Sequence, residues 1–153
     1  ENPTNTFVGG FMGSPAMNFF EAELQGDTVK VGSTVLKLPQ AKLENIQHYN
    51  GKKVILGIRP ETIGLVHQNE HIIEQNKIQV PIVISELTGA EQIVHSNIDG
   101  QNFIAKVNAN YKLENGKSIL LYFDLEKAHL FDVDTTERIT VDNDIYYNTL
   151  IES

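Results

Sequence analysis

One short stretch of the sequence has the residue types of a metal site. His67, Glu70 and His71 lie in HQNEH, which has the H-x-x-E-H spacing of zinc hydrolases. In such sites two histidines on one helix face bind Zn²⁺ and the glutamate acts as general base. Asn69 lies inside the stretch and no helical apolar stripe runs through it, so we expect a solvated loop and no metal.

A second stretch carries two carboxylates close together. Glu86 and Glu91 lie on either side of Gly89 in ELTGAEQ. Two acids at such a separation could act as acid and base, for example on a glycoside. A catalytic pair also needs a pocket and perturbed pKa values, whereas a turn with two exposed acids is far commoner. We therefore interpret this stretch as a turn, with Glu86 able to face a partner.

Other catalytic motifs do not occur in the sequence. It has no G-x-S-x-G nucleophile motif, and GGFMGSP lacks the Lys-Ser/Thr of a phosphate loop. It also has no cysteine, which excludes disulfides, thiol catalysis and zinc–thiolate sites. We therefore expect no catalytic residue, no cofactor and no ATP site in this stretch of chain.

The net charge bears on the class of partner. The 153 residues carry a formal net charge of −8. Nucleic-acid-binding proteins neutralise phosphates with clustered Lys and Arg, so this charge argues against such a partner. Four aromatic residues could stack on bases, but without basic neighbours we expect them in the core. They are Phe103, Tyr111, Tyr122 and Phe123.

The elements that must position these residues are mostly short strands. Regular turn signals separate about ten apolar runs, which is typical of a closed or partly closed β-barrel. Gly32-Ser33 and Asp99-Gly100 are two-residue hairpin signals. Helices are expected over residues 3–15 and 39–51 only. Residues 77–87 are expected to form one long strand, the first of a five-stranded OB-like barrel over residues 77–132.

The stretch ILGIRPETIGL places Arg59, Pro60 and Glu61 inside a strand-like run. A catalytic charge pair, a ligand clamp and a structural corner would each explain it. Pro60 fixes its own φ and biases Arg59 toward an extended conformation, which favours the corner. We expect Arg59 to pair with an acid, either Glu61 or one from the other β segment.

Three stretches together resemble a known family. FVGGFMGSPAMNFF, ILGIRPETIGL and HLFDVDTTERI are similar to the C-terminal part of ATP-binding subunits of sugar ABC importers. These are the importers of the maltose, multiple-sugar and glycerol-3-phosphate type, and ELTGAE matches a further motif in the expected order. The resemblance covers residues 7–139. Gly9 replaces the usual alanine, and neither the loop 67–76 nor the tail after residue 140 matches.

The resemblance implies a mainly β fold. It would be an OB-type β-barrel with an appended small β subdomain, called TOBE, and one or two short helices. Residues 1–14 would be the last helix of an ATPase domain, 15–139 the regulatory domain and 140–153 a tail. The chain opens at Glu1 rather than at methionine, so we expect it to be part of a longer protein.

The resemblance also implies a function. The chain would be a non-catalytic regulatory and dimerisation domain, cytoplasmic and peripheral at the inner face of the membrane. Its partners would be a second copy, the permeases, a sugar-binding protein and, in some members, an inhibitory protein. ATP and Mg²⁺ would bind in the ATPase domain. Glu86, Gly89 and Glu91 would then lie at the dimer or regulatory interface. A small-ligand module that senses an oxyanion or a sugar is the alternative.

Overall fold

The computed structural model describes residues 16–44, 46–65 and 72–140. The helix expected over residues 3–15 lies outside these ranges, as does the tail 141–153. No helix in the described ranges is long and apolar enough to cross a membrane.

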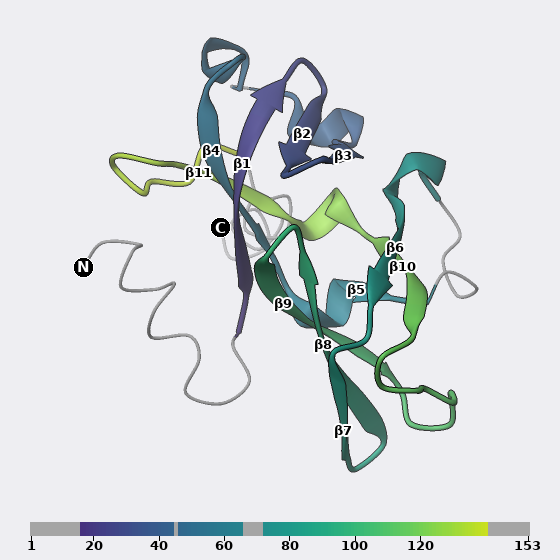
Figure 1. Ribbon diagram of the computed structural model, residues 1–153. Coiled ribbons are helices and arrows are strands. Elements are labelled where there is room, and N and C mark those ends of the chain that lie inside the picture. The colour runs from purple at the N-terminus through teal and green to yellow at the C-terminus, as the bar shows by residue number, and fades with distance from the viewer. Residues whose placement is uncertain (1–15, 45, 66–71, 141–153) are drawn as a thin grey trace, which may run out of the picture.

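The described chain folds into three antiparallel sheets (Figure 1). The first sheet has the order β11-β4-β1-β2-β3, the second β5-β10-β6 and the third β7-β8-β9. The strands are β1 (Asn18–Gln25), β2 (Thr28–Val31), β3 (Thr34–Lys37), β4 (Lys53–Ile58), β5 (Ile63–Gly64), β6 (Lys77–Pro81), β7 (Ile84–Thr88), β8 (Glu91–Ile98), β9 (Gln101–Asn108), β10 (Ser118–Phe123) and β11 (His129–Asp132).

The two hairpins expected from turn residues are confirmed. Val31 pairs with Thr34 across Gly32-Ser33, and Gly32 has a φ of 60°. Ile98 pairs with Gln101 across Asp99-Gly100, where φ is 48° and 88°. Positive φ at both central residues defines the type I′ turn, whose twist matches that of the flanking strands.

The five-stranded sheet is built differently from the prediction. It contains residues 18–58 together with β11, rather than residues 77–132. β11 pairs with β4 in a register that places His129 opposite Gly57, so a strand more than 70 residues after β4 completes the first sheet. Within the described residues the three sheets stay open, because backbone pairing does not close them into a barrel.

The long strand expected over residues 77–87 is in fact two strands in two sheets. β6 pairs with β10 as far as Pro81, and β7 pairs with β8 from Ile84. Between them the Ile82 N–H still donates to Lys117 O at 2.7 Å, whereas the Val83 N–H donates to His95 O at 2.9 Å. The backbone therefore changes partner between these two residues, which an apolar run does not reveal.

The helix expected over residues 39–51 was also wrong. This segment forms two 3₁₀ turns, η1 (Gln40–Lys42) and η2 (Gln47–Tyr49). Short isolated helices are marginal, and tertiary packing decides their form. Here Leu38 and Ile46, both 2% exposed, anchor the two turns separately in the core. The remaining 3₁₀ turns of the described ranges are η3 (Pro60–Thr62), η5 (Glu74–Asn76) and η6 (Leu125–Lys127).

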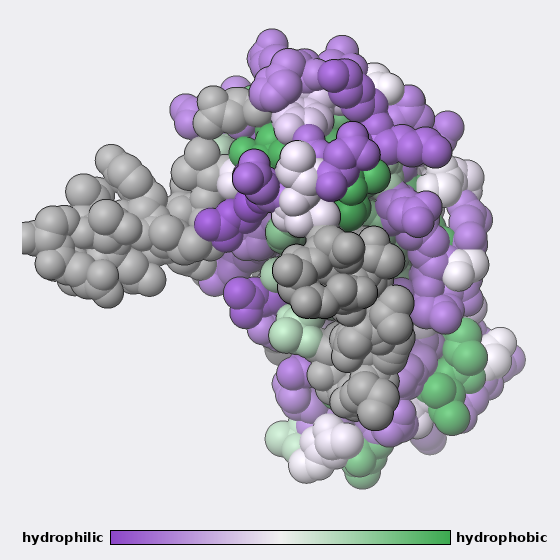
Figure 2. All heavy atoms as spheres, turned by 90° about the vertical axis from the view of Figure 1, so that its left-hand side faces the viewer, coloured by the Kyte–Doolittle hydropathy of each residue, from purple (hydrophilic) through white to green (hydrophobic). Residues whose placement is uncertain are grey.

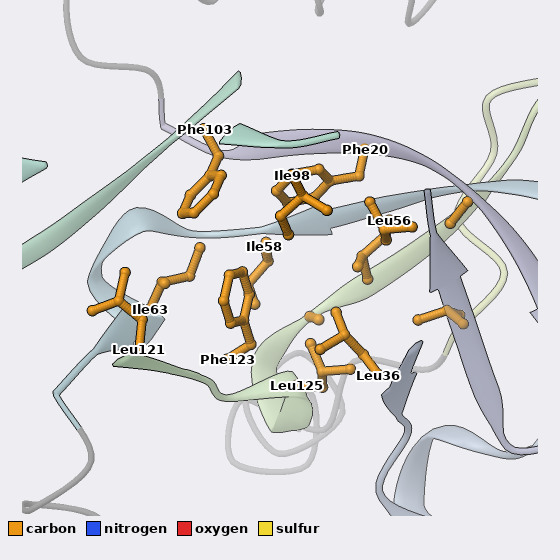
Figure 3. Close-up of a cluster of buried hydrophobic side chains, with 14 of the residues drawn as sticks. Phe20, Leu36, Leu56, Ile58, Ile63, Ile98, Phe103, Leu121, Phe123 and Leu125 are labelled. Carbon is orange, nitrogen blue, oxygen red and sulfur yellow. The ribbon is translucent and has the colours of Figure 1, made fainter. Parts of the chain in front are cut away.

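One hydrophobic core joins the three sheets (Figure 3). Phe20 of β1, Phe103 of β9 and Phe123 of β10 meet there, each from a different sheet. Ring centroids lie 5.6 Å apart for Phe20 and Phe103, and 5.5 Å apart for Phe103 and Phe123. Such contacts stabilise beyond the area they bury. The core position expected for Phe103, Tyr122 and Phe123 is confirmed, but Tyr111 is 44% exposed.

Candidate functional site

The predicted interface residues lie on the β7–β8 hairpin. Glu86 is on β7, Glu91 begins β8, and Gly89 lies in the turn between them with a φ of 59°. A Cβ at Gly89 would meet no atom within 4 Å, so this glycine serves the turn conformation rather than a close contact. The hairpin extends from the lower end of the molecule in Figure 1.

The hairpin carries apolar side chains that the core does not cover. Leu87 is 69% exposed, Val83 57% and Ile84 47%. Figure 2 shows hydrophobic surface at this lower end of the molecule, among hydrophilic residues. β7 is also an edge strand of its sheet. Asn115 covers part of this edge, because the Ser85 N–H donates to Asn115 Oδ1 at 3.1 Å. Exposed apolar residues on an edge strand are typical of contact surfaces.

The two acids of the hairpin have different surroundings. Glu86 Oε2 lies 2.6 Å from His95 Nε2, a diagonal neighbour on β8. Glu86 is therefore engaged within the chain. Glu91 is exposed at the turn end of the hairpin, opposite Thr88.

A metal site finds no support in the described ranges, which contain no group of three or more His, Asp or Glu side chains placed to hold an ion. His67, Glu70 and His71 lie outside these ranges.

Arg59, Pro60 and Glu61 lie where the chain passes from the first sheet to the second. β4 ends at Ile58, η3 spans Pro60–Thr62, and β5 follows at once. Pro60 is buried, whereas Arg59 and Glu61 are exposed. Pro60 occupies the first position of the turn, where its missing N–H costs nothing.

Hydrogen bonds of Thr62 hold this corner. Its backbone N–H and its hydroxyl both donate to Arg59 O, at 3.0 Å and 2.8 Å. Its own carbonyl accepts from Asp124 N–H at 3.0 Å, which ties the corner to the end of β10. Within the described residues the ion pairs join Lys37 to Asp27, Lys77 to Glu74 and His95 to Glu86. The ion pair expected for Arg59 is therefore not among them.

Sequence reasoning missed a set of amide side chains that join the sheets. Asn18 of β1 pairs with the backbone of Ile104, and Gln101 of β9 pairs with the backbone of Glu21. Asn76 does the same to Lys37 of β3, at 2.7 Å and 2.9 Å. Nothing in the sequence marks these residues, since an Asn or Gln near a strand end is also a common turn residue.

Comparison with known families divides the chain at the same corner. The MalK OB fold domain family matches residues 13–63, and the TOBE domain family matches residues 56–131. This chain belongs to the MalK-type OB–TOBE family. The two matched ranges overlap at residues 56–63, so the corner is the junction between the OB and TOBE parts. The OB match also corrects the assignment of the OB fold to residues 77–132.

Curated relatives carry similar names. The chain is 42% identical over 144 residues to the oligosaccharides import ATP-binding protein MsmX of Bacillus subtilis, covering 91% of this chain and 39% of that protein. It is 34% identical over 143 residues to the trehalose/maltose import ATP-binding protein MalK of Thermococcus litoralis, covering 91% and 38%. The OB–TOBE chain thus spans less than two-fifths of the length of these relatives.

A solved structure has the same fold. The cytoplasmic molybdate-binding protein ModG superposes with a TM-score of 0.60, covering 74% of this chain and 94% of that chain. The sequences are 14% identical, so the likeness concerns the fold alone.

Proposed function

We propose that this OB–TOBE chain is the regulatory and dimerisation region of the ATP-binding subunit of a carbohydrate ABC importer. The observation that carries the proposal is the ordered match of the OB and TOBE families over residues 13–131. The relatives that cover 91% of the chain are named as import ATP-binding proteins for oligosaccharides and for trehalose and maltose.

In such an importer the chemistry takes place elsewhere in the subunit. ATP and Mg²⁺ bind in the ATPase domain, and two subunits close on ATP and open after hydrolysis. Contact between the regulatory regions keeps the subunits paired when ATP is gone, because it keeps the local concentration of the partner high. The permeases and a sugar-binding protein complete the complex, which places the chain at the cytoplasmic face of the membrane.

The β7–β8 hairpin is the surface we assign to this pairing. Leu87 supplies apolar area on one face of β7. Ile84 supplies it on the other face, where Glu86 and Glu91 add charge. Interfaces combine an apolar centre with a polar rim, and rim charges set specificity and association rate more than affinity. Gly89 holds the turn that carries this surface.

Sedimentation tests the pairing directly. The wild-type chain at tens of micromolar is expected to sediment as a concentration-dependent dimer, and Leu87→Ser to weaken the dimer. Leu120→Ser is the matched control, since Leu120 is also exposed, at 44%, but lies on β10 in another sheet. A monomer at every concentration, or equal effects of both substitutions, would remove the hairpin from the proposal.

A chimera tests the importer role. The ATPase part of MsmX would be joined to this chain in place of its own matching region, and oligosaccharide uptake measured in Bacillus subtilis. We expect uptake to be retained. A stable chimera without uptake would contradict the proposal.

The alternative function, sensing of a small oxyanion or sugar, has its own measurement. Thermal shifts would be recorded with sugars, sugar phosphates, molybdate and sulfate. A concentration-dependent rise in melting temperature with one of these would favour the sensor, while no rise would leave the importer region as the better description.

A further inference from the structure

The two tight turns that the sequence marks most clearly contact each other. Ser33 belongs to the turn between β2 and β3, and Asp99 to the turn between β8 and β9. Ser33 N–H and Ser33 Oγ–H both donate to Asp99 Oδ2, at 2.5 Å and 2.8 Å. Figure 1 shows the end of the β8–β9 hairpin reaching toward β2 and β3.

Gly32 leaves room for this contact. A Cβ on Gly32 would lie 2.3 Å from Asp99 Oδ2 and 2.8 Å from Asp99 Cβ, closer than real atoms approach. The positive φ of Gly32 explains why the hairpin needs a glycine. It does not explain why the space above that glycine holds the carboxylate of a residue from another sheet. The close approach is therefore a second constraint on the same position.

The contact is also favourable electrostatically. The backbone N–H of Ser33 and then its hydroxyl lower the pKa of the Asp99 carboxyl below its usual value. Asp99 therefore stays ionised near neutral pH, and hydrogen bonds to an ionised acceptor are stronger than neutral ones. Both residues are exposed, so the contact faces solvent and can open without disturbing the core.

The position of the contact gives it a mechanical meaning. β2 and β3 lie in the range matched by the OB family, whereas β8 and β9 lie in the range matched by the TOBE family. Beyond the covalent corner at residues 59–62 and the backbone pairing of β11 with β4, the two parts also meet through side chains. These contacts include Asn18 with Ile104, Gln101 with Glu21, and the turn contact described here. The turn contact is the outermost of these points on the β8–β9 hairpin.

We propose that Ser33 and Asp99 form a latch between the OB and TOBE parts. Closed, it holds the β8–β9 hairpin against the β2–β3 hairpin in one orientation. Open, it lets the end of the β8–β9 hairpin move away while the shared core stays intact. This latch does not depend on the importer role.

Hydrogen exchange of the whole chain tests the latch through its action across the two parts. Asp99→Asn keeps a residue that tolerates the positive φ of 48° but removes the charge. It is expected to make amide exchange several-fold faster at Ser33 and Thr34. Ser33→Ala is expected to do the same at Asp99 and Gly100. Exchange along β10, in the core, should be unchanged in both variants.

Asp27→Ala is the control. Asp27 is also an exposed acid in a hairpin turn, and its ion pair with Lys37 stays inside the first sheet. It should leave exchange at Asp99 and Gly100 unchanged. If Asp99→Asn does not change exchange at Ser33, or if Asp27→Ala changes the β8–β9 turn equally, there is no latch.

A cross-link gives the opposite perturbation. The chain has no cysteine, so Ser33→Cys combined with Asp99→Cys creates a single possible intrachain disulfide. In the oxidised form, amide hydrogens at both turns should exchange no faster than in the wild type. Reduction of the disulfide should make them exchange as fast as in the Asp99→Asn variant. Two free thiols that persist under oxidising conditions would show that the turns do not approach, which overturns the proposal.

Discussion

The side-chain amide of Asn18 lies against the backbone of Ile104 and makes two hydrogen bonds with it. Asn18 Nδ2 donates to Ile104 O and Ile104 N–H donates to Asn18 Oδ1, each at 2.9 Å. Three residues along β1, the backbone of Glu21 pairs in the same way with the side chain of Gln101. The two pairs run in antiparallel order, so amide side chains join β1 to β9 where the sheets have no backbone ladder between them in the described residues.

Removing the first of these amides should be costly. Asn18 is 4% exposed, so Asn18→Ala leaves the N–H and C=O of Ile104 without partners beside the core. We expect the free energy of unfolding to fall by about 1–3 kcal/mol, as for other unsatisfied buried groups. Denaturant unfolding measures this. Asn102→Ala is the control, because Asn102 is exposed on β9, the strand of Ile104. An equal loss of unfolding free energy in this variant would show that the amide side chains between β1 and β9 have no special role.

The corner should depend on Pro60 more than on Arg59. Pro60 is buried and restricts the unfolded chain, so Pro60→Ala should lower the free energy of unfolding by about 1–2 kcal/mol. Arg59 is exposed and has no ion pair in the described residues, so Arg59→Ala should change it by less than about 0.5 kcal/mol. Thermal and denaturant unfolding compare the two, and the reverse order would restore Arg59 as the residue that holds the corner.

Gly57, within the motif that marks the corner, should not tolerate a side chain. Its Cβ would lie 2.6 Å from Met17 Sδ, 3.1 Å from a ring carbon of Phe131 and 3.4 Å from one of Phe19. Phe19 and Phe131 pack edge to face at 5.9 Å over this site. Gly57→Ala should therefore displace these rings and cost about 1–3 kcal/mol.

The expected sign for Gly57 is opposite to that of strand propensity, which favours alanine over glycine. Unfolding experiments decide between the two effects. Neither Gly26→Ala nor Ala22→Gly measures the propensity alone, because φ at Gly26 is 63° and Ala22 is buried in the core. The sign of the effect of Gly57→Ala on the free energy of unfolding is therefore the readout. A stabilised Gly57→Ala variant would show that the rings yield freely.

Tyr49 and Asp132 should shift each other's titration. Tyr49 OH donates to Asp132 Oδ2 at 2.7 Å. The backbone N–H of Thr135 and then the Tyr49 hydroxyl lower the pKa of Asp132, while the hydrogen bond to Asp132 raises the pKa of Tyr49. Tyr49→Phe should therefore raise the pKa of Asp132 toward its usual value, as carbon-detected NMR titration would show. Tyr111→Phe, at an exposed tyrosine, should leave it unchanged.

The same pair fixes the direction of a pH effect. Because the folded-state pKa of Asp132 is lowered, its stabilisation is present above the unfolded pKa of about 3.9 and is lost as the pH falls through the folded value. Because the folded-state pKa of Tyr49 is raised, its contribution to folding stability is present below the unfolded pKa of about 10. That contribution is lost as the pH rises through the folded-state pKa. Tyr49→Phe should therefore lower the free energy of unfolding at pH 7 and change it little at pH 2. An equal loss at both would point to packing alone.

Local sequence determined much of this protein. Gly32-Ser33 and Asp99-Gly100 predict their hairpins correctly, because positive φ at a two-residue turn restricts the residues that fit. Pro60 limits the backbone at its own position and the one before it, which marks the corner. The ordered motifs around these positions were enough to indicate the family.

Tertiary structure decided which of these local elements became neighbours. A strand's alternation tells which face is buried, but not which strand lies beside it. The sequence therefore did not reveal three features of the fold. They are the pairing of β11 with β4, the change of sheet between Ile82 and Val83, and the correct range of the OB fold. The Asn18–Ile104 pair joins residues 86 positions apart, and the Ser33–Asp99 contact joins residues 66 apart. Such contacts arise only once the shared core has brought the sheets together, so the sequence supplied the turns and strands while the packing chose their partners.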